Sequence, residues 1–216
     1  EGQLNFLYPS YLPQKEIMLS ENCKIYTELS DHKLMLKVSN ESELLGDISK
    51  LYNGIKTGNN KEYLSSEKIS KIYRPVLRGR DFNKYSYPNY KLYVHFDPKK
   101  LWSNTNENRL AKFPKIILRQ TSDALRATME TQGYLTMDTT HIIYESKYNL
   151  YYLLGLINSK LLNWYYQCMV SEVGRVFAEV KIINLKQIPI KVNADDTQKI
   201  LVNLVEQILY AKKIMN

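Results

Sequence analysis

Cationic and amide side chains gather beside turn-forming residues in the middle third of this 216-residue chain. They are Lys56, Thr57, Asn59, Asn60, Lys61, Arg74, Arg78, Arg80, Lys84, Arg119, Gln120 and Arg126. An arginine fork matches guanine O6 and N7, and an Asn or Gln amide matches adenine N6 and N7 in the major groove. Lysine and hydroxyl groups suit phosphates, which position a protein without specifying sequence. These residues therefore predict a surface that contacts double-stranded DNA.

Glycines lie next to these side chains and indicate that loop tips carry them. Gly54 and Gly58 lie in a loop predicted at residues 53–61, where glycine and asparagine permit a positive φ. Gly79 separates two arginines and lets the backbone approach a ligand closely between two planar donors. We therefore expect rigid strands to present the cationic groups on exposed turns.

The chain carries a formal net charge of +8, and the excess is concentrated in its middle. Residues 50–126 hold 17 basic and 6 acidic side chains, whereas the remainder holds 13 basic and 16 acidic ones. A concentrated positive field favours a polyanionic partner more than a uniform excess does. The alternative is a lysine-rich surface that follows from a composition rich in Lys, Asn, Ile and Tyr.

The sequence lacks the common catalytic signatures: a GxGxxG or Walker-type glycine loop, GxSxG and HExxH. His32, His95 and His141 are far apart and lack metal-ligand spacing, so no catalytic or metal-binding residue is predicted. One nuclease-like half-motif is present, the ExK of residues 179–181, which would need an aspartate such as Asp138 to complete a Mg²⁺ site. We interpret it as a surface pair and keep a Mg²⁺-dependent nuclease as the weaker alternative.

Cysteine use and the absence of targeting segments indicate the compartment. Cys23 and Cys168 are the two cysteines, and no CxxC spacing is present. With no secretory signal and no membrane span, the sequence predicts a cytoplasmic protein without a membrane partner. The chain begins at Glu1 instead of Met, which suggests a piece of a longer protein.

Short segments rich in β-branched and aromatic residues predict strands of a mainly antiparallel sheet. The predicted strands are residues 51–52, 73–77, 91–96, 115–120, 124–129 and 141–144. Pro75 and Pro114 are expected at sheet edges or strand starts, because proline cannot donate to the ladder. Alternation within residues 24–38 also indicates strands, and residues 42–45 predict a short helix or turn.

The final third has helical spacing instead. Residues 148–170 carry a wide apolar face and predict one helix, and residues 181–192 predict an extended return. Asp195 or Asp196 is expected to cap a last helix. The apolar stripe of that helix is Ile200, Leu201, Leu204, Val205, Ile208 and Leu209.

This order of elements predicts an α+β fold, with a mainly antiparallel sheet in the middle of the chain followed by two C-terminal helices. We expect three parts along the chain. Residues 1–43 form a lead-in that packs on the domain, residues 44–192 form the recognition domain, and residues 193–216 form a helix that docks another domain or subunit.

Several segments occur in an order that resembles a known family. They are LGDI at 45–48, GIKTGNN at 54–60, PVLRGRD at 75–81, the strand at 115–119, YYLLGLINSKLL at 151–162, GRVF at 174–177 and LKQIPI at 185–190. Together they resemble the TaqI-like C-terminal specificity domain, the target-recognition module of adenine methyltransferases and of fused restriction–modification enzymes. Similar patterns occur in type I restriction specificity subunits. The resemblance covers the chain from about residue 44 to its end.

The resemblance implies a DNA-reading module without catalysis of its own. In such families an Asn-Pro-Pro-Tyr-like tetrapeptide and an S-adenosylmethionine loop lie upstream in the full-length polypeptide, and both are absent here. It implies S-adenosylmethionine as the cofactor of the parent enzyme, with Mg²⁺ if that enzyme cuts DNA. The implied partner is a methyltransferase domain in the same chain or in another subunit. Tyr85, Tyr87 and Tyr90 are expected to pack on sugars or on a flipped-out base.

A protein-interaction scaffold with an incidental basic face is the alternative from another class. RNA binding is a third reading, weakened by the lack of an aromatic RNP-type strand.

Overall fold

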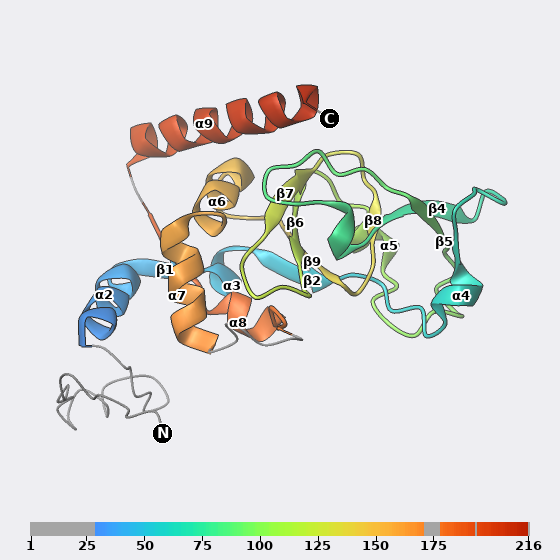
Figure 1. Ribbon diagram of the computed structural model, residues 1–216, viewed down its shortest axis with the longest axis horizontal. Helices are drawn as coiled ribbons and strands as arrows, with labels where there is room; N and C mark the ends of the chain where they lie inside the picture. The colour runs from blue at the N-terminus through green and yellow to red at the C-terminus, as the bar shows by residue number, and fades with distance from the viewer. Residues whose placement is uncertain (1–28, 171–177, 193, 216) are drawn as a thin grey trace, which may run out of the picture.

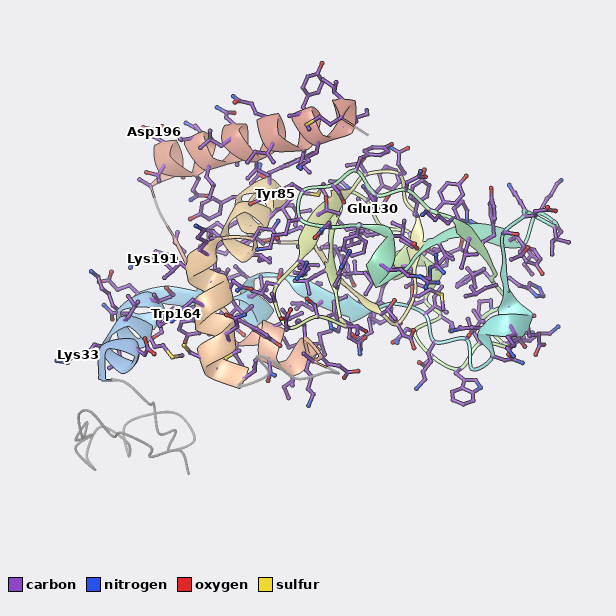
Figure 2. All side chains as sticks on the ribbon, in the orientation of Figure 1. Lys33, Tyr85, Glu130, Trp164, Lys191 and Asp196 are labelled. Carbon is purple, nitrogen blue, oxygen red and sulfur yellow. The ribbon has the colours of Figure 1, made fainter. Side chains whose placement is uncertain are left out.

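The computed structural model describes residues 29–170, 178–192 and 194–215. Figure 1 shows an elongated molecule, with helices gathered toward one end and strands toward the other. The strands form two four-stranded sheets and one two-stranded sheet in this described part of the chain. Figure 2 adds the side chains, with Glu130 among the strands and Lys33 and Asp196 at the helical end.

The central sheet has the strand order β2-β9-β6-β7 and is antiparallel throughout. Its strands are β2 (Lys50–Asn53), β9 (Thr140–Tyr144), β6 (Lys115–Arg119) and β7 (Ala127–Glu130). Every residue of β7 and β9 is buried, because other elements cover both faces of the sheet. This sheet therefore forms the rigid centre of the domain.

The second sheet has the order β3-β5-β4-β8. Its strands are β3 (Leu64–Ser65), β5 (Leu92–His95), β4 (Tyr73–Leu77) and β8 (Leu135–Thr136), and only the β4–β8 pair is parallel among them. Pro75 pairs with Tyr93 of β5, and β8 joins β4 only from Val76 onward. Pro75 thus lies where β4 has one partner, and Pro114 directly precedes β6, as the sequence predicts.

Helices cover one face of the central sheet (Figure 1). Long helices are α2 (Leu29–Ser39), α6 (Leu150–Ile157), α7 (Lys160–Val170) and α9 (Asp195–Ile214). Shorter ones are α3 (Leu45–Ile48), α4 (Asn60–Tyr63), α5 (Glu107–Leu110) and α8 (Ile182–Lys186). Strands β1 (Ser42–Leu44) and β10 (Pro189–Lys191) pair antiparallel beside them.

Alternation along β6 divides the core into layers. Ile116 and Leu118 pack with the helices, in a cluster that includes Leu153 and Val205. Ile117 points to the opposite face and packs with Leu77 and Phe82. A further cluster joins the two sheets. The odd-numbered positions of β6 therefore face the same side as the turn that follows β4.

A close helix crossing fixes α9 on this frame. A Cβ added to Gly155 of α6 would lie 3.0 Å from Leu201 and Val205 of α9, so the small residue lets the two helices approach. Val205 is buried, whereas Ile200, Leu204 and Ile208 on the same helix are exposed. The predicted apolar stripe is thus half covered by the domain itself.

The strand prediction for residues 24–38 is wrong. Residues 29–39 form the helix α2, and residues 24–28 lie outside the described part. Met35 is buried and Val38 packs against the core, which is the three-residue spacing of a helix. The alternation of polar and apolar residues at 33–38 fits both the period of a strand and the period of a helix. Packing beside β10 favours the helix.

The single helix predicted at residues 148–170 is two helices, α6 and α7. Asn158 ends the first because its side chain accepts from the backbone N–H of Ala127 (3.0 Å) and donates to the Ala127 carbonyl (2.9 Å). The Ser159 hydroxyl then accepts from the N–H of Leu162 at the start of the second. A tertiary bond to β7 therefore interrupts an otherwise continuous helical pattern.

Other boundaries also differ from the predictions. Residues 42–45 begin with strand β1, and the extended return predicted at 181–192 begins with helix α8. The N-cap of α9 is Ala194, so Asp195 and Asp196 lie in the first turn, where their charges still favour the helix dipole. β7 begins later than predicted because the preceding residues form a turn, in which the N–H of Leu125 donates to Asn163. The division into 1–43, 44–192 and 193–216 stays a prediction.

In the described part of the chain, no helix combines the length and the hydrophobicity that crossing a membrane requires.

A buried ion pair holds β6 to β7. Lys115 and Glu130 are paired in the strand register, have 0% exposed side chains and bring Nζ and Oε2 to 3.0 Å. Burial lowers the pKa of Lys115, and Glu130 opposes that shift. Lys115 also donates to the carbonyl oxygens of Leu110 and Tyr134. The pair is thus fully hydrogen-bonded, as a buried charge must be.

We expect Glu130→Gln to lower the free energy of unfolding by about 3 kcal/mol, because it leaves a buried lysine without its counter-charge. Urea denaturation measures this change. Glu145→Gln is the matched control, because Glu145 makes the same ion pair with Lys112 on the surface, and little change is expected. The double variant Lys115→Met/Glu130→Gln should be more stable than Glu130→Gln alone. An equal loss of unfolding free energy in Glu130→Gln and in the double variant would show that the unpaired charge of Lys115 does not cause the loss.

Candidate nucleic-acid interface

The turn between β8 and β9 brings the predicted cationic groups together. The N–H of Asp138 donates to the carbonyl of Ile55 at 2.8 Å, next to the loop that contains Lys56. The N–H of Gly79 donates to the Thr139 hydroxyl at 3.0 Å, and the N–H of Gln120 donates to the Thr139 carbonyl at 2.9 Å. Loops that are far apart in sequence therefore meet around one turn.

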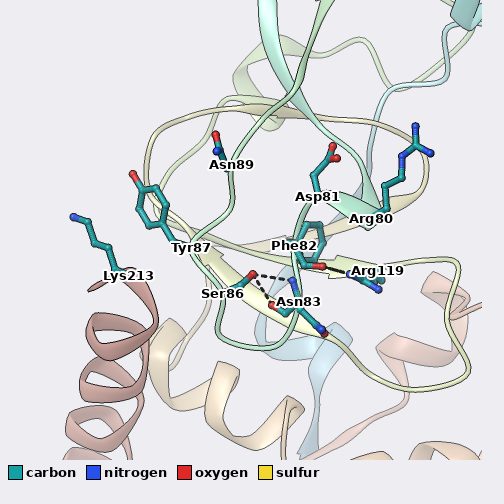
Figure 3. A pocket seen from close by; sticks show the side chains of 9 residues that line it. All are labelled: Arg80, Asp81, Phe82, Asn83, Ser86, Tyr87, Asn89, Arg119 and Lys213. Carbon is teal, nitrogen blue, oxygen red and sulfur yellow. Dashed lines mark hydrogen bonds between the residues drawn. The ribbon is translucent and has the colours of Figure 1, made fainter. Parts of the chain in front are cut away.

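The turn after β4 has a rigid geometry that Asp81 imposes. The Asp81 carboxylate accepts from Nε and Nη2 of Arg78 at 3.0 and 2.9 Å and from the Arg78 backbone N–H at 2.8 Å. A Cβ on Gly79 would lie 2.6 Å from the Thr139 carbonyl oxygen, so glycine is required there. Arg80 is exposed between these anchored residues. In the close view, its guanidinium extends away from the ribbon (Figure 3).

Arg119 ends β6 on the same side as this turn. Its guanidinium donates to the Phe82 carbonyl, with Nε at 2.8 Å, and lies 5.9 Å from the centre of the Phe82 ring. The arginine is therefore held in place at the end of a buried strand. A concave surface of about 400 Å³ is lined by Arg78, Gly79, Arg80, Arg119, Thr121 and Thr139.

A larger adjoining cavity, about 670 Å³, shares Arg80 and Arg119 with the first. Its lining residues are Arg80, Asp81, Phe82, Asn83, Ser86, Tyr87, Asn89, Arg119 and Lys213. Lys213 comes from the last turn of α9, and its Nζ lies 5.4 Å from the centre of the Tyr87 ring. Figure 3 shows Lys213 and Tyr87 on one side of the cavity and Arg80 on the other. Cations, amides and aromatic rings thus surround one hollow.

Like charges crowd the edge of this surface. Burial lowers the pKa of Lys84, and the neighbouring charge of Arg126 lowers it further. The pKa of Arg119 is lowered by the same two causes. Arg126 has a distant ion-pair partner within the described residues, Asp123, at 3.8 Å. A bound anion would relieve this repulsion, so the cluster of Lys84, Arg119 and Arg126 suits a phosphate.

The loop that contains Lys56 is organised by its own polar groups. Thr57 is 2% exposed, and its hydroxyl donates to the side-chain oxygen of Asn60 at 2.6 Å. The Asn59 amide donates to Glu62 at 3.3 Å. These three side chains shape the loop, and Lys56 is exposed on it. The loop ends earlier than predicted, because residues 60 and 61 belong to α4, on which Lys61 is exposed. As DNA contacts all five stay predictions.

The remaining predicted contacts lie in different surroundings. Arg74 pairs with Glu107 on the second sheet, and about 38% of its side chain is exposed. Gln120 lies at the end of β6, where its carbonyl accepts from the N–H of Val180 at 2.7 Å. The structure thus brings six predicted residues together: Arg78, Arg80, Arg119, Gln120, Lys84 and Arg126. Asp138 connects the loop that contains Lys56 to this group. Arg74 lies apart from them in its ion pair.

Sequence reasoning missed Asn83, Ser86, Asn89, Thr139 and Lys213 as lining residues. The cluster of Asn, Ser and Pro at residues 83–89 is a turn signal that could have indicated an exposed loop. Lys213 gives no such signal, because only the packing of α9 brings its end to the cavity.

The ExK segment of residues 179–181 lies opposite Thr121. Glu179 is exposed and forms an isolated bridge with Thr121, while Val180 is buried. Burial raises the pKa of Asp138, and Lys56 partly opposes this shift. His141 has its two ring nitrogens at 2.7 Å from the Asn53 side-chain oxygen and 2.5 Å from the Val180 carbonyl. Among the described residues, His, Cys, Asp and Glu form no group of three with the arrangement of a metal site.

The chain matches a known protein family. Residues 74–190 match the model of the TaqI-like C-terminal specificity domain, which is more than half of the chain. The chain belongs to this family. It is therefore a specificity domain, a module for recognising DNA sequence in restriction–modification enzymes, and the family is non-catalytic. The predictions of the family and of an α+β target-recognition fold are confirmed.

Solved structures show the same fold in larger proteins. The type IIG restriction endonuclease BpuSI matches with a TM-score of 0.62 at 10% identity, over 82% of this chain and 28% of that one. The type IIL enzyme MmeI, solved in complex with DNA, matches with a TM-score of 0.53 at 11% identity, over 79% of this chain and 29% of that one. A type I restriction–modification complex matches with a TM-score of 0.52 at 9% identity, over 86% of this chain and 46% of that one. The specificity domain thus spans less than half of each of these chains. Curated proteins gave no match.

We expect Arg126→Ala to weaken DNA binding and to make the log–log salt dependence shallower by about one unit, because one phosphate contact is lost. The melting temperature should stay equal or rise, since the charge that repels Lys84 and Arg119 is removed. Fluorescence anisotropy across a salt series and a thermal melt measure the two effects. Lys199→Ala, which removes an equal charge at the far end of α9, should leave both unchanged. A lower melting temperature with unchanged affinity would assign Arg126 a structural role.

Proposed function

We propose that this specificity domain reads double-stranded DNA for a site-specific adenine-N6 methyltransferase in the cytoplasm, and that it performs no catalysis itself. The observation that carries the proposal is the meeting of Arg80, Arg119 and Thr139 at adjoining hollows, next to a cluster of like charges. Exposed arginine forks on a rigid frame suit base edges, and clustered charges suit phosphates.

The proposed mechanism separates positioning from reading. Lys61, Lys84 and Arg126 contact phosphates and set the orientation of the duplex. Neutralising about six phosphates gives a log–log salt slope near −5, so binding weakens steeply with salt. Arg80 then reads base edges, which contributes about 1–3 kcal/mol of discrimination per contact. Arg119, which the Phe82 carbonyl holds in place, joins the phosphate cluster.

The contacts of the two arginines in the turn after β4 give them different roles. One edge of the Arg78 guanidinium, Nε and Nη2, is engaged by Asp81, so we assign Arg78 to holding the turn. Arg80 is exposed and has no hydrogen bond or ion pair within the described residues, so its donors are free for DNA. This assignment makes Arg80 the stronger candidate for base recognition.

The catalytic half of the enzyme is proposed to lie in the rest of the polypeptide or in another subunit. It would bind S-adenosylmethionine, would need Mg²⁺ if it also cuts DNA, and would form the opposite wall of a clamp around the duplex. The exposed residues Ile200, Leu204 and Ile208 on α9 support a docking role for this helix.

A protein-interaction scaffold is the second candidate, and the same exposed stripe on α9 favours it. The two proposals differ in what the basic surface does. Retention on a DNA column that salt elutes at a much higher concentration than a control protein of equal net charge supports DNA recognition. Coincident elution of the two supports the scaffold.

We expect Arg80→Ala to relax base preference at one or two positions of the preferred site, because a bidentate contact is lost. Selection of bound duplexes from a random-sequence pool, with the unaltered chain and the variant in parallel, measures this preference. Lys61→Ala is the matched comparison and should weaken binding to all sequences alike. An unchanged selected sequence for Arg80→Ala would remove Arg80 from the reading residues.

A further inference from the structure

Trp102 is an exposed tryptophan next to a buried leucine. The side chain of Trp102 is 71% exposed, whereas Leu101 is 7% exposed and packs with the core cluster between the two sheets. The chain has two tryptophans, and the other, Trp164, is half-buried on α7. Isolated exposed apolar residues are common on proteins, so exposure alone assigns no role to Trp102.

The backbone holds Trp102 firmly against the loop that contains Lys56. The N–H groups of Trp102 and Ser103 donate to the Lys56 carbonyl at 2.9 and 3.2 Å, and the N–H of Lys56 donates to the Ser103 carbonyl at 3.2 Å. These bonds form an antiparallel bridge between the two loops. The indole is thus presented from a fixed backbone and not from a free loop tip.

The indole ring itself lies across the backbone of Gly58. A Cβ added to Gly58 would lie 2.1 Å from Nε1 of Trp102, and the φ of Gly58 is +83°. Glycine is therefore required twice at this position, by its backbone conformation and by the ring above it. One edge of the ring is fixed against the loop while most of its surface faces water.

A lysine lies beside this ring, with Nζ of Lys56 5.7 Å from the ring centre. Lys99 and Lys100 precede Trp102 in the chain, and Lys100 pairs with Asp97 at 4.0 Å. Lys56 also acts on the carboxyl group of Asp138, in the turn that anchors Gly79 and Gln120. These contacts connect Trp102 through Lys56 and the Asp138 turn to the arginine hollows.

We propose that Trp102 is a base-stacking contact of the DNA interface. Its exposed ring stacks on a nucleobase of the bound DNA, while Lys56 and Lys99 contact the flanking phosphates. An aromatic face stacks on any base because every base has a π-face, and side chains wedged at a base step open it. This inference rests on the proposed function and adds a contact outside the arginine hollows.

Tryptophan emission tests the contact directly. In the Trp164→Phe variant, Trp102 is the one tryptophan left, and stacking on a base quenches its emission. The probes are a mixed-sequence duplex, the same duplex with one unpaired base, and heparin, which carries charge but no bases. We expect quenching by duplex DNA and none by heparin. Quenching by the intact duplex would show that Trp102 stacks on a base at an opened base step. Quenching only by the duplex with the unpaired base would show that Trp102 stacks on an extrahelical base.

Affinity gives a second readout. We expect Trp102→Ala to weaken duplex binding by about 10-fold or more and Trp102→Phe to weaken it less, with heparin retention unchanged in both. Phe113→Ala is the matched control, because Phe113 is an aromatic residue with 62% exposure beside the ion-paired Lys112, and no loss is expected. Gly58→Ala should reduce the quenching, since it displaces the ring.

The outcomes separate the two proposals. Duplex binding seen by anisotropy without quenching, or with equal affinity in Trp102→Ala, overturns the Trp102 contact and leaves the proposed function intact. Failure of the unaltered chain to bind either duplex overturns the proposed function, and the Trp102 contact with it.

Discussion

The buried pair of Lys115 and Glu130 is the constraint on which the position of the interface depends. It joins β6 to β7 at one end of their ladder, and both charges are sealed from water. Glu130 also accepts from the N–H groups of Gln132 and Gly133 in the turn toward β8. Because side chains alternate along a strand, Lys115 and Arg119 lie on the same face of β6, four residues apart. A change of register by one residue would turn Arg119 away from the hollow it lines.

This frame lets the opposite end of the sheet hold an unfavourable arrangement of charge. The charge of Arg126 adds to burial in lowering the pKa of Lys84 and of Arg119, and this repulsion costs free energy in the unbound domain. The core around Ile116, Leu118 and the helices offsets this cost. Such local conflict is typical of binding sites, where the ligand supplies the missing counter-charge. The buried pair and the candidate interface therefore lie at opposite ends of the same strands.

Sequence reasoning succeeded where the signal is local. β4 has the bounds predicted from its β-branched and aromatic residues, and β6 differs by one residue, because buried strands are specified by their own side chains. The same local segments carried the family resemblance. Sequence reasoning failed where distant residues decide the outcome. Asn158 divides a helix by binding β7, and α2 is a helix because Met35 packs into the core. Thr139 and Lys213 reach the interface only through tertiary packing, so no local pattern indicates them.

The position of Lys213 changes how α9 must be regarded. From the sequence, this helix is a separate element that docks another part of an enzyme. In the structure, Leu201 and Val205 lie against Gly155, and the last turn places Lys213 beside Tyr87 at the cavity. The helix thus lines the candidate interface and also presents Leu204 and Ile208 to solvent. Any partner that covers the exposed stripe would act on the same helix that lines the cavity. The helix predicted as a separate docking element therefore packs on the rest of the domain, beside the candidate interface.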